Sequence, residues 1–459
     1  MIQRRTWPAA LLAGLLVCLP AACRAPAPPP APAAAVSPSI PADFQGLRQD
    51  PAVYLAGAGW RMDPGYQAQR VAALRQAHFA PWGQTQPLLS AAEFRETLHG
   101  LTARTGYGEN TLPQGPEWGA RLASLADPEA YPNAGWPGLT LQTGDLRSLP
   151  TRRPQLKGFG HAGEGLAFDR LQESLLPPGT PVWVCHASRD GAWLFCDTPI
   201  GSHWLAAEKV ARAGDELIQR WRSAPLAAIL RDGTGLRDGQ GGFVCQADLG
   251  TLLPLAGQDG GGLTILAPRA CAGQAQDLAV RLTPGQAAPI FLSLTPTALA
   301  RLAAPLLGQA YGWGGSFGGR DCSALLRDLF LPFGLWLPRN SRQQAEAGAQ
   351  RIELEGLTAG EKEALIRQQG RPGLSLLYMP GHIMLYLGQW EGRAVALHAL
   401  WGLRTQEASG QEGRWVVGRV VISDLWPGRQ QGEAVPASSE PGNRLTALVN
   451  LTPDAALAP

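Results

Sequence analysis

The sequence predicts a multidomain protein with a mostly helical N-terminal domain, two small β-barrels and a C-terminal α+β domain. Three observations lead to this fold class. The 459 residues are enough for about two to four domains. Short apolar strands separated by Gly, Pro and Asp turns fill the middle of the chain. Helical and strand patterns then alternate from residue 291 onward, and 56 Gly and 40 Pro favour turns over long helical bundles.

The N-terminus has the pattern of an export signal. Two arginines, Arg4 and Arg5, precede the short apolar run Trp7–Leu19, and small residues lead to Cys23. The run is too short to span a membrane, so residues 1–23 are expected to be a signal peptide. The end of the run resembles the lipobox of bacterial lipoproteins, with Pro20 in place of the usual leucine, which makes Cys23 the predicted lipid-bearing residue. The alternative is an ordinary cleavage site with an incidental cysteine.

A Pro/Ala-rich linker over residues 24–42 follows the signal, and such a composition favours an extended spacer. The mature protein is therefore expected outside the cytoplasm, held to a membrane through Cys23. Four cysteines in the middle of the chain leave the redox state open, because they form either disulfides or buried thiols. Cys185 and Cys196 flank a predicted hairpin turn, SRDG, whereas Cys245 and Cys271 have no local partner.

Residues 43–155 mix helical segments with Pro and Gly and predict the helical N-terminal domain. Within it, Ser90 and Glu93 form a predicted capping box before an apolar stripe. Residues 156–215 read as strand, turn, strand, turn, strand, and residues 216–290 repeat that pattern. Each segment has the size of a small barrel.

Residues 291–433 predict the α+β domain, with a helix opening at Thr295 and Pro296 and a second helix over 358–369. Strands are expected over residues 374–379, 382–387, 394–400 and 414–425. The tail over residues 434–459 is rich in Pro, Ser and Ala and is expected to be flexible.

In the segment YGWGGSFGGRDCSALLRDLF, a glycine-rich stretch comes first and Cys322 follows it at the start of a predicted helix. The helix pattern comes from Leu325, Leu326, Leu329 and Phe330, which fall on one face. A thiol in the first turn is close to unpaired N–H groups and to the positive end of the helix dipole, which favour the thiolate. The glycines are expected to let the backbone come close to whatever approaches the sulfur.

Two histidines downstream complete a possible catalytic set. The segment from His382 to His398 reads as strand, turn GQWEG and strand, with both histidines eight residues from the turn centre at Trp390. In a symmetric hairpin they would lie directly opposite each other on one face, about 5 Å apart. Cys322 would then attack, His382 would take its proton and His398 would orient His382.

Two other interpretations fit the same residues. The histidines could face solvent on an unrelated hairpin, or one cysteine and two histidines could bind zinc. The zinc site lacks a fourth ligand at local spacing, so neither a metal nor an organic cofactor is expected.

Four motifs in register resemble the NlpC/P60 family of cell-wall cysteine peptidases. They are YGWGG with RDCSALLRDLF, WLPRNSRQQ, MPGHIMLYLG and LHALWG, and they extend over about 140 residues. The resemblance implies a papain-like NlpC/P60 catalytic domain with a Cys–His–His triad, preceded by two SH3-like barrels of the SH3b1 and SH3b2 kinds. Within the family, the chain resembles bacterial γ-D-glutamyl-L-diamino acid endopeptidases with a helical N-terminal domain.

The resemblance also implies the substrate, which is the peptidoglycan stem peptide with a free N-terminal L-Ala, cut between γ-D-Glu and the diamino acid. Substrate-binding roles are implied for Tyr311, Trp313, Asp321 and Ser323. A carboxylate at Asp321 suits an ammonium group, although the residue could simply cap the helix. Arg170 stands where relatives often have an aromatic side chain, which would alter recognition of the amino end.

Composition excludes some functions. The net charge of +2 and the absence of long Lys/Arg runs do not favour nucleic acid as a partner. Two other functions stay open beside the peptidase: a cell-wall-binding protein with a vestigial catalytic domain, and an amidase or acyltransferase that uses the same thiol.

Overall fold

The computed structural model describes residues 36–37, 44, 46–160, 163–290, 292–406, 412–428, 435 and 439–458. The predicted signal peptide, with Cys23, lies outside the described residues. The described part of the predicted linker is strand β1 (Val36–Ser37), which pairs in parallel with β23 (Glu412–Asp424). No helix within these ranges has the length and apolar character needed to cross a membrane.

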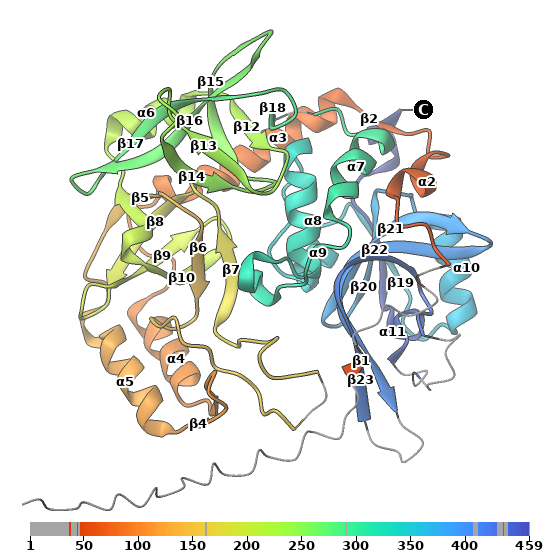
Figure 1. Ribbon diagram of the computed structural model, residues 1–459, viewed down its shortest axis with the longest axis horizontal. Helices are drawn as coiled ribbons and strands as arrows, with labels where there is room; N and C mark the ends of the chain where they lie inside the picture. Colours follow the sequence, from red (N-terminus) through yellow and green to blue (C-terminus); the bar gives the residue numbers. More distant parts are fainter. Residues whose placement is uncertain are drawn as a thin grey trace, which may run out of the picture. The chain divides into compact units, whose positions relative to one another are not determined.

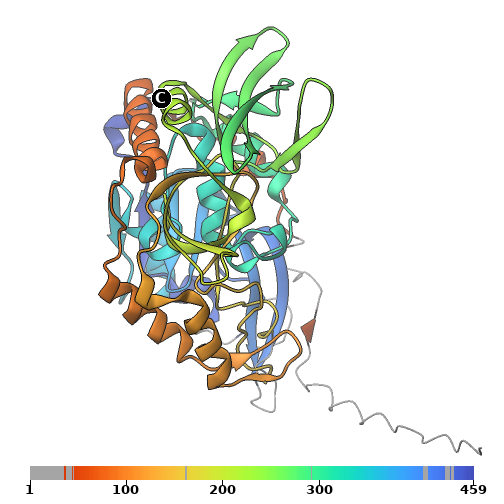
Figure 2. The same cartoon turned by 90° about the vertical axis from the view of Figure 1, so that its left-hand side faces the viewer.

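The N-terminal region is helical, as predicted. Its α-helices are α2 (Pro51–Leu55), α3 (Pro64–Phe79), α4 (Ala91–Thr102) and α5 (Pro116–Ala126). Helix α4 begins with the predicted capping box, because Ser90 accepts from the Glu93 N–H and the Glu93 carboxylate accepts from the Ser90 N–H. Helices α4 and α5 pack side by side in both views, beside the short strands β3 (Gly106–Tyr107) and β4 (Pro113–Gln114) (Figure 1, Figure 2).

His78, near the end of α3, predicts a loss of stability in acid. The side chain is 4% exposed, and its Nε2 has no hydrogen-bond partner within the described residues. Burial lowers the pKa of His78 to about 3, and Arg75 acts in the same direction. The folded protein keeps His78 neutral, whereas the unfolded chain binds a proton below a pKa of about 6.5. The free energy of unfolding is therefore unaffected above that pH and falls below it. From pH 6 to 5 this residue should remove about 1.2 kcal/mol of unfolding free energy.

The measurement is urea unfolding at several pH values for the wild type and His78→Leu. The variant should show the shallower loss of stability between pH 6 and pH 4, since a leucine takes up no proton. Equal slopes for the two proteins would contradict the assignment. His382 and His398 keep their own contributions in both proteins, so the difference isolates His78.

Two strands of the N-terminal region pair with strands of the first barrel. Strands β5 (Trp136–Thr140) and β6 (Gly144–Arg147) lie within the predicted N-terminal domain, yet β5 pairs with β8 (Pro181–Ala187) and β6 pairs with β7 (Gln172–Leu176). Both strands are short and contain glycine, so the sequence shows no clear strand pattern at these positions. The remaining strands are β9 (Trp193–Thr198), β10 (Gly201–Ala206) and β11 (Val210–Arg212).

The two cysteines beside the predicted SRDG turn are buried free thiols. Strands β8 and β9 form the predicted hairpin, but Cys196 lies opposite Val184, and a register shift follows before His186. Cys185 packs into a cluster with Phe94 and Trp204, whereas Cys196 packs into a separate cluster with Leu146 and Leu205. The two thiols therefore serve as small apolar side chains on opposite faces of the sheet. Cys245 is also a buried free thiol, and Cys271 is exposed and free.

The second barrel follows helix α6 (Asp215–Ser223). Its strands are β12 (Leu226–Ile229), β13 (Thr234–Arg237), β14 (Phe243–Ala247), β15 (Leu252–Asp259), β16 (Gly262–Cys271), β17 (Gln274–Leu282) and β18 (Ala287–Pro289). Strand β17 pairs with β11 of the first barrel, so among the described strands the two barrels share one continuous sheet.

The C-terminal domain packs helices against a mixed sheet, as predicted. The described strands follow the order β1-β23-β22-β21-β20-β24-β19. They include β19 (Gln350–Glu353), β20 (Ser375–Met379), β21 (His382–Trp390) and β22 (Arg393–Gln406), and the helices include α7 (Pro296–Ala303), α8 (Cys322–Phe330), α9 (Ser341–Glu346) and α10 (Ala359–Gln369). Helix α8 packs on β21 and β22 (Figure 1), and its four predicted core residues are fully buried.

The predicted flexible tail is wrong for residues 439–458. After α11 (Pro441–Arg444), strand β24 (Ala447–Asn450) inserts between β20 and β19 in the sheet of the C-terminal domain. Ala447, Leu448 and Val449 are fully buried. The last described strand, β25 (Leu457–Ala458), pairs with β2 (Arg61–Met62) near the other end of the chain. Pairings this distant in sequence have no local signal, which explains the error.

Candidate active site

Cys322 is the first residue of α8, and its thiol is protonated in the resting protein. The residue is 8% exposed. Burial raises the pKa of the Cys322 thiol to about 12, and the neighbouring Asp321 carboxylate acts in the same direction. The N–H groups of Ile383 and Ser323 and the Arg339 guanidinium oppose this rise without cancelling it. The expected preference for a thiolate is therefore contradicted, because burial outweighs the groups that favour the charged form. The thiol needs a base.

The glycines before Cys322 serve packing against the first barrel. Gly314 and Gly315 have φ of +57° and +88°, which favours glycine over any other residue. A Cβ on Gly314 would lie 2.3 Å from the Gln172 carbonyl oxygen, and one on Gly315 would lie 2.4 Å from Leu175 Cγ. The Gln172 side chain also donates to the Gly314 carbonyl at 3.1 Å. Gly314 and Gly315 therefore allow strand β7 to approach the segment before Cys322.

The two histidines lie on one face of the β21–β22 hairpin, as predicted, but they are not directly opposite. The turn is at Glu391 and Gly392, and the register shifts between Tyr386 and Gly388. Continuing the pairing of Leu385 with Leu397 places His398 opposite Met384, so His382 is its diagonal neighbour. The imidazoles still meet, with 2.8 Å between His382 Nε2 and His398 Nδ1. Diagonal pairs on one face are within reach of such rings.

Both histidines are neutral at pH 7 and are further linked to a serine. Burial lowers the pKa of His382 to about 4, with Arg444 in the same direction and Asp321 opposing. Burial, and then His382, lower the pKa of His398 as well. The second ring nitrogen of His398, Nε2, lies 3.0 Å from Ser423 Oγ on β23. Ser423 was not predicted, because no local spacing in the sequence connects it to His398.

Helix α8, which begins with Cys322, packs on β21, which begins with His382. The Cys322 sulfur accepts from the N–H of Ile383, which is the residue after His382. A protonated thiol beside a neutral imidazole can pass its proton as it attacks, which is the arrangement of a cysteine nucleophile with a general base. Among the described residues, no group of three or more His, Cys, Asp or Glu side chains forms a metal-binding cluster.

Four aromatic side chains gather beside the thiol. Phe168, on the loop before β7, lies 5.3 Å from Trp313, 5.7 Å from Trp401 and 6.5 Å from Tyr311, measured between ring centroids. Tyr311 and Trp313 were predicted for this place, whereas Phe168 and Trp401 were not. Burial raises the pKa of Tyr311, and Cys322, once it is deprotonated at high pH, and the Asp321 carboxylate add to the rise. The phenol therefore keeps its proton and can donate a hydrogen bond.

Asp321 caps the helix and forms an ion pair with Arg339, and its predicted contact with the substrate amine stays a prediction. Its Oδ1 accepts from the Ala324 N–H at 2.9 Å, and its Oδ2 accepts from Arg339 Nη2 at 2.6 Å. Arg339 also donates to Ser323 Oγ at 2.9 Å and to Ser174 Oγ, on β7, at 2.7 Å. Burial raises the pKa of Asp321, but Arg339 and the backbone N–H donors outweigh it and leave the pKa lowered. Arg339 belongs to the WLPRNSRQQ motif, but its ion pair with Asp321 was not predicted.

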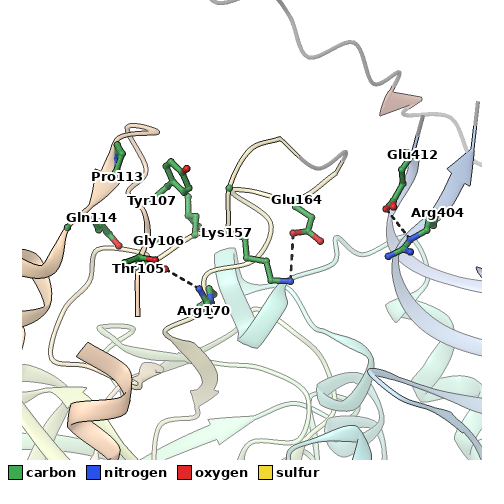
Figure 3. A pocket seen from close by; sticks show the side chains of 13 residues that line it. Thr105, Gly106, Tyr107, Pro113, Gln114, Lys157, Glu164, Arg170, Arg404 and Glu412 are labelled. Atoms are coloured by element: carbon green, nitrogen blue, oxygen red, sulfur yellow. Dashed lines mark hydrogen bonds and ion pairs between the residues drawn. The ribbon is translucent and has the colours of Figure 1, made fainter. Parts of the chain in front are cut away.

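Arg170 points away from the thiol. Its guanidinium donates to the Thr105 carbonyl and lines a cavity of about 650 Å³ with Tyr107, Gln114 and Lys157 (Figure 3). The aromatic side chain at the site comes instead from Phe168, two positions earlier. The effect of Arg170 on recognition of the amino end stays a prediction.

Comparisons with known proteins agree with this architecture. Sequence profiles match the NLPC_P60 N-terminal stabilising domain over residues 10–131, an SH3 domain of SH3b1 type over 154–206, an SH3 domain of SH3b2 type over 215–260 and the NlpC/P60 family over 308–415. No curated protein matches the chain.

Two solved structures are similar in fold. An NlpC/P60 endopeptidase from Photobacterium damselae subsp. piscicida has 22% sequence identity and a TM-score of 0.78, and the match covers 91% of this chain and 98% of that one. An NlpC/P60 family protein from Bacillus cereus has 15% identity and a TM-score of 0.44, with 69% and 100% of the two chains covered. By the profile matches, the chain carries an NlpC/P60 domain, the NLPC_P60 N-terminal stabilising domain and two SH3b-type domains, and it shares its fold with the Photobacterium endopeptidase.

Proposed function

We propose that the protein hydrolyses the bond between γ-D-Glu and the diamino acid in peptidoglycan stem peptides. The observation that carries this proposal is the hydrogen bond between His382 and His398, made beside Cys322 within the matched NlpC/P60 region. A buried thiol, a neutral imidazole and a second imidazole that orients it are the parts of a cysteine peptidase.

In the proposed reaction Cys322 attacks the γ-amide carbonyl while its proton moves to His382. The C–N bond then breaks, the amine of the diamino acid leaves with that proton, and a thioester stays on Cys322. Water, deprotonated by His382, attacks the thioester and restores the thiol. The protonated Tyr311 phenol supports a further role as hydrogen-bond donor to the oxygen that becomes negative.

A closed site supports a preference for peptides with a free N-terminal L-Ala. Phe168 brings the first barrel against Tyr311, Trp313 and Trp401, so one side of the site is walled by aromatic side chains. Such a wall suits a short peptide end better than a continuous strand. Asp321 and Ser323 are proposed to receive the ammonium group, which would then share the Asp321 carboxylate with Arg339.

The proposal includes export and attachment to a membrane. The basic N-terminus, the apolar run and Cys23 support a lipoprotein signal, and the Pro/Ala-rich linker would hold the folded part away from the lipid surface. A cell-envelope location agrees with the SH3b-type and NlpC/P60 domains.

The test is incubation of the protein with the tripeptide L-Ala-γ-D-Glu-diaminopimelate, with products identified by mass spectrometry. An N-acetylmuramyl form of the same peptide blocks the amine and serves as the matched substrate. Release of L-Ala-γ-D-Glu from the free peptide alone is the expected result. Cleavage of both forms would support the peptidase activity and contradict the preference for a free amino end. Cleavage of neither, together with binding to intact cell walls, would favour the cell-wall-binding function.

A further inference from the structure

We infer that Ser423 sets the tautomers of both active-site histidines, so that the ring nitrogen of His382 that accepts the thiol proton stays free. The inference deepens the proposed hydrolysis and rests on it. Ser423 is a positioning residue, because it touches neither the thiol nor the substrate and acts through His398.

A line of three hydrogen bonds runs inward from His382. His382 Nε2 lies 2.8 Å from His398 Nδ1, and His398 Nε2 lies 3.0 Å from Ser423 Oγ. Ser423 Oγ in turn lies 2.7 Å from the backbone carbonyl oxygen of Asp424. His398 and Ser423 are fully buried, so water cannot replace a missing partner within this line.

The carbonyl at the end of the line fixes the direction of every proton. A carbonyl oxygen only accepts, so the single hydroxyl proton of Ser423 points to Asp424. The serine oxygen can then only accept from His398, whose Nε2 must carry a hydrogen. A neutral imidazole has one N–H, so His398 Nδ1 is the acceptor for His382. His382 therefore carries its hydrogen on Nε2.

This order leaves His382 Nδ1 with a lone pair. A free lone pair on this nitrogen suits a group that takes a proton from Cys322. If Ser423 donated to His398 instead, the whole line would reverse. His382 Nδ1 would then carry a hydrogen and could not accept one from the thiol.

The obvious alternative orienting group is the Asp424 carboxylate, but it is used elsewhere. Its Oδ2 accepts from Arg393 at 2.9 Å, and its Oδ1 accepts from the Trp426 N–H at 2.9 Å. The charged groups that shift the pKa of His382 are Arg444 and Asp321, and His382 in turn lowers the pKa of His398. Among the described residues, orientation of His398 therefore comes from a hydroxyl and a carbonyl, neither of which titrates.

In the reaction the thiol proton moves to His382 Nδ1 as the S–C bond forms. The ring becomes cationic and keeps its Nε2–H bond to His398, whose lone pair stabilises the charge. The same proton later passes from Nδ1 to the leaving amine. The line through Ser423 keeps its direction throughout, so no proton needs to cross it.

The experiment compares Ser423→Ala and Ser423→Thr with the wild type. Nitrogen-15 NMR of histidine-labelled protein reports the tautomer of each of the seven histidines directly. We expect Nε2–H tautomers on His382 and His398 in the wild type and in Ser423→Thr. In Ser423→Ala we expect a second tautomer with the hydrogen on Nδ1, and hydrolysis and alkylation of Cys322 by iodoacetamide slowed about tenfold at pH 7, the usual scale for loss of one buried hydrogen bond.

The matched control is Ser375→Ala, which removes another fully buried hydroxyl from the same sheet, one bonded to Asn450. It should change neither tautomers nor alkylation. Unchanged tautomers in Ser423→Ala, or equal slowing in Ser375→Ala, would overturn the inference even if Ser423→Thr fails to fold. The NMR and alkylation measurements use no peptide substrate. If the proposed substrate is wrong, hydrolysis will be absent while the tautomers and alkylation rates still follow the expectation.

Discussion

Replacing Cys322 by alanine is expected to abolish hydrolysis of the tripeptide, with a loss of at least about 10⁴-fold in kcat. Without the sulfur no thioester forms, and His382 alone has no nucleophile to activate. The fold should persist, because alanine fits the volume that the thiol leaves and α8 keeps its cap at Asp321. The measurement is release of L-Ala-γ-D-Glu by mass spectrometry, together with a thermal unfolding curve.

The matched control for this substitution is Cys245→Ala, which removes a buried free thiol from the second barrel. It should leave hydrolysis within about twofold of the wild type, because Cys245 lies on β14 and far along the chain from the site. Substantial turnover by Cys322→Ala would contradict the assignment of the nucleophile. Equal losses in both variants would point to general destabilisation.

Replacing Arg339 by methionine is expected to cost about 3–5 kcal/mol of unfolding free energy, the usual cost of leaving a buried charge without its partner. Asp321 is 7% exposed and depends on Arg339 for its opposite charge. The same substitution removes the hydrogen bond to Ser174 of the first barrel, so the site should also loosen against that barrel. Urea unfolding measures the free energy.

Two further variants separate this effect from the loss of any arginine. Arg342→Met removes a nearby arginine whose side chain is 81% exposed and paired with Glu346, and it should change stability by less than about 0.5 kcal/mol. The double variant Asp321→Asn with Arg339→Met removes both charges and should recover part of the loss. If Arg339→Met is no less stable than Arg342→Met, the buried ion pair does not stabilise the site.

Much of the fold was predictable because its signals are local. The capping box at Ser90 depends on residues three apart, and the helix of Cys322 depends on an apolar face within nine residues. Hairpins with alternating apolar residues identified both barrels. The strand Ala447–Asn450 was not predictable, because it is stabilised by β20 and β19, which are distant in the chain.

For the site, the sequence by itself predicted that His382 and His398 meet and that Cys322 begins a helix, and these residues carry the proposed roles of nucleophile, base and orienting histidine. Cys322 opens a helix, as predicted. The placement of His382 and His398 on one face depends on the bulge, because the register next to the two-residue turn would put them on opposite faces and the shift between Tyr386 and Gly388 restores one face. Motif order was enough to name Tyr311 and Trp313 as neighbours of the thiol.

Only the tertiary structure decided the properties that depend on burial and on distant partners. Burial makes Cys322 a protonated thiol, against the groups that favour the charged form. Packing of the first barrel supplies Phe168 and turns Arg170 away, and Arg339 neutralises Asp321 across 18 residues of chain. The physical reason is that desolvation and ion pairing depend on which segments meet in space, whereas periodicity and capping depend on residues a few positions apart.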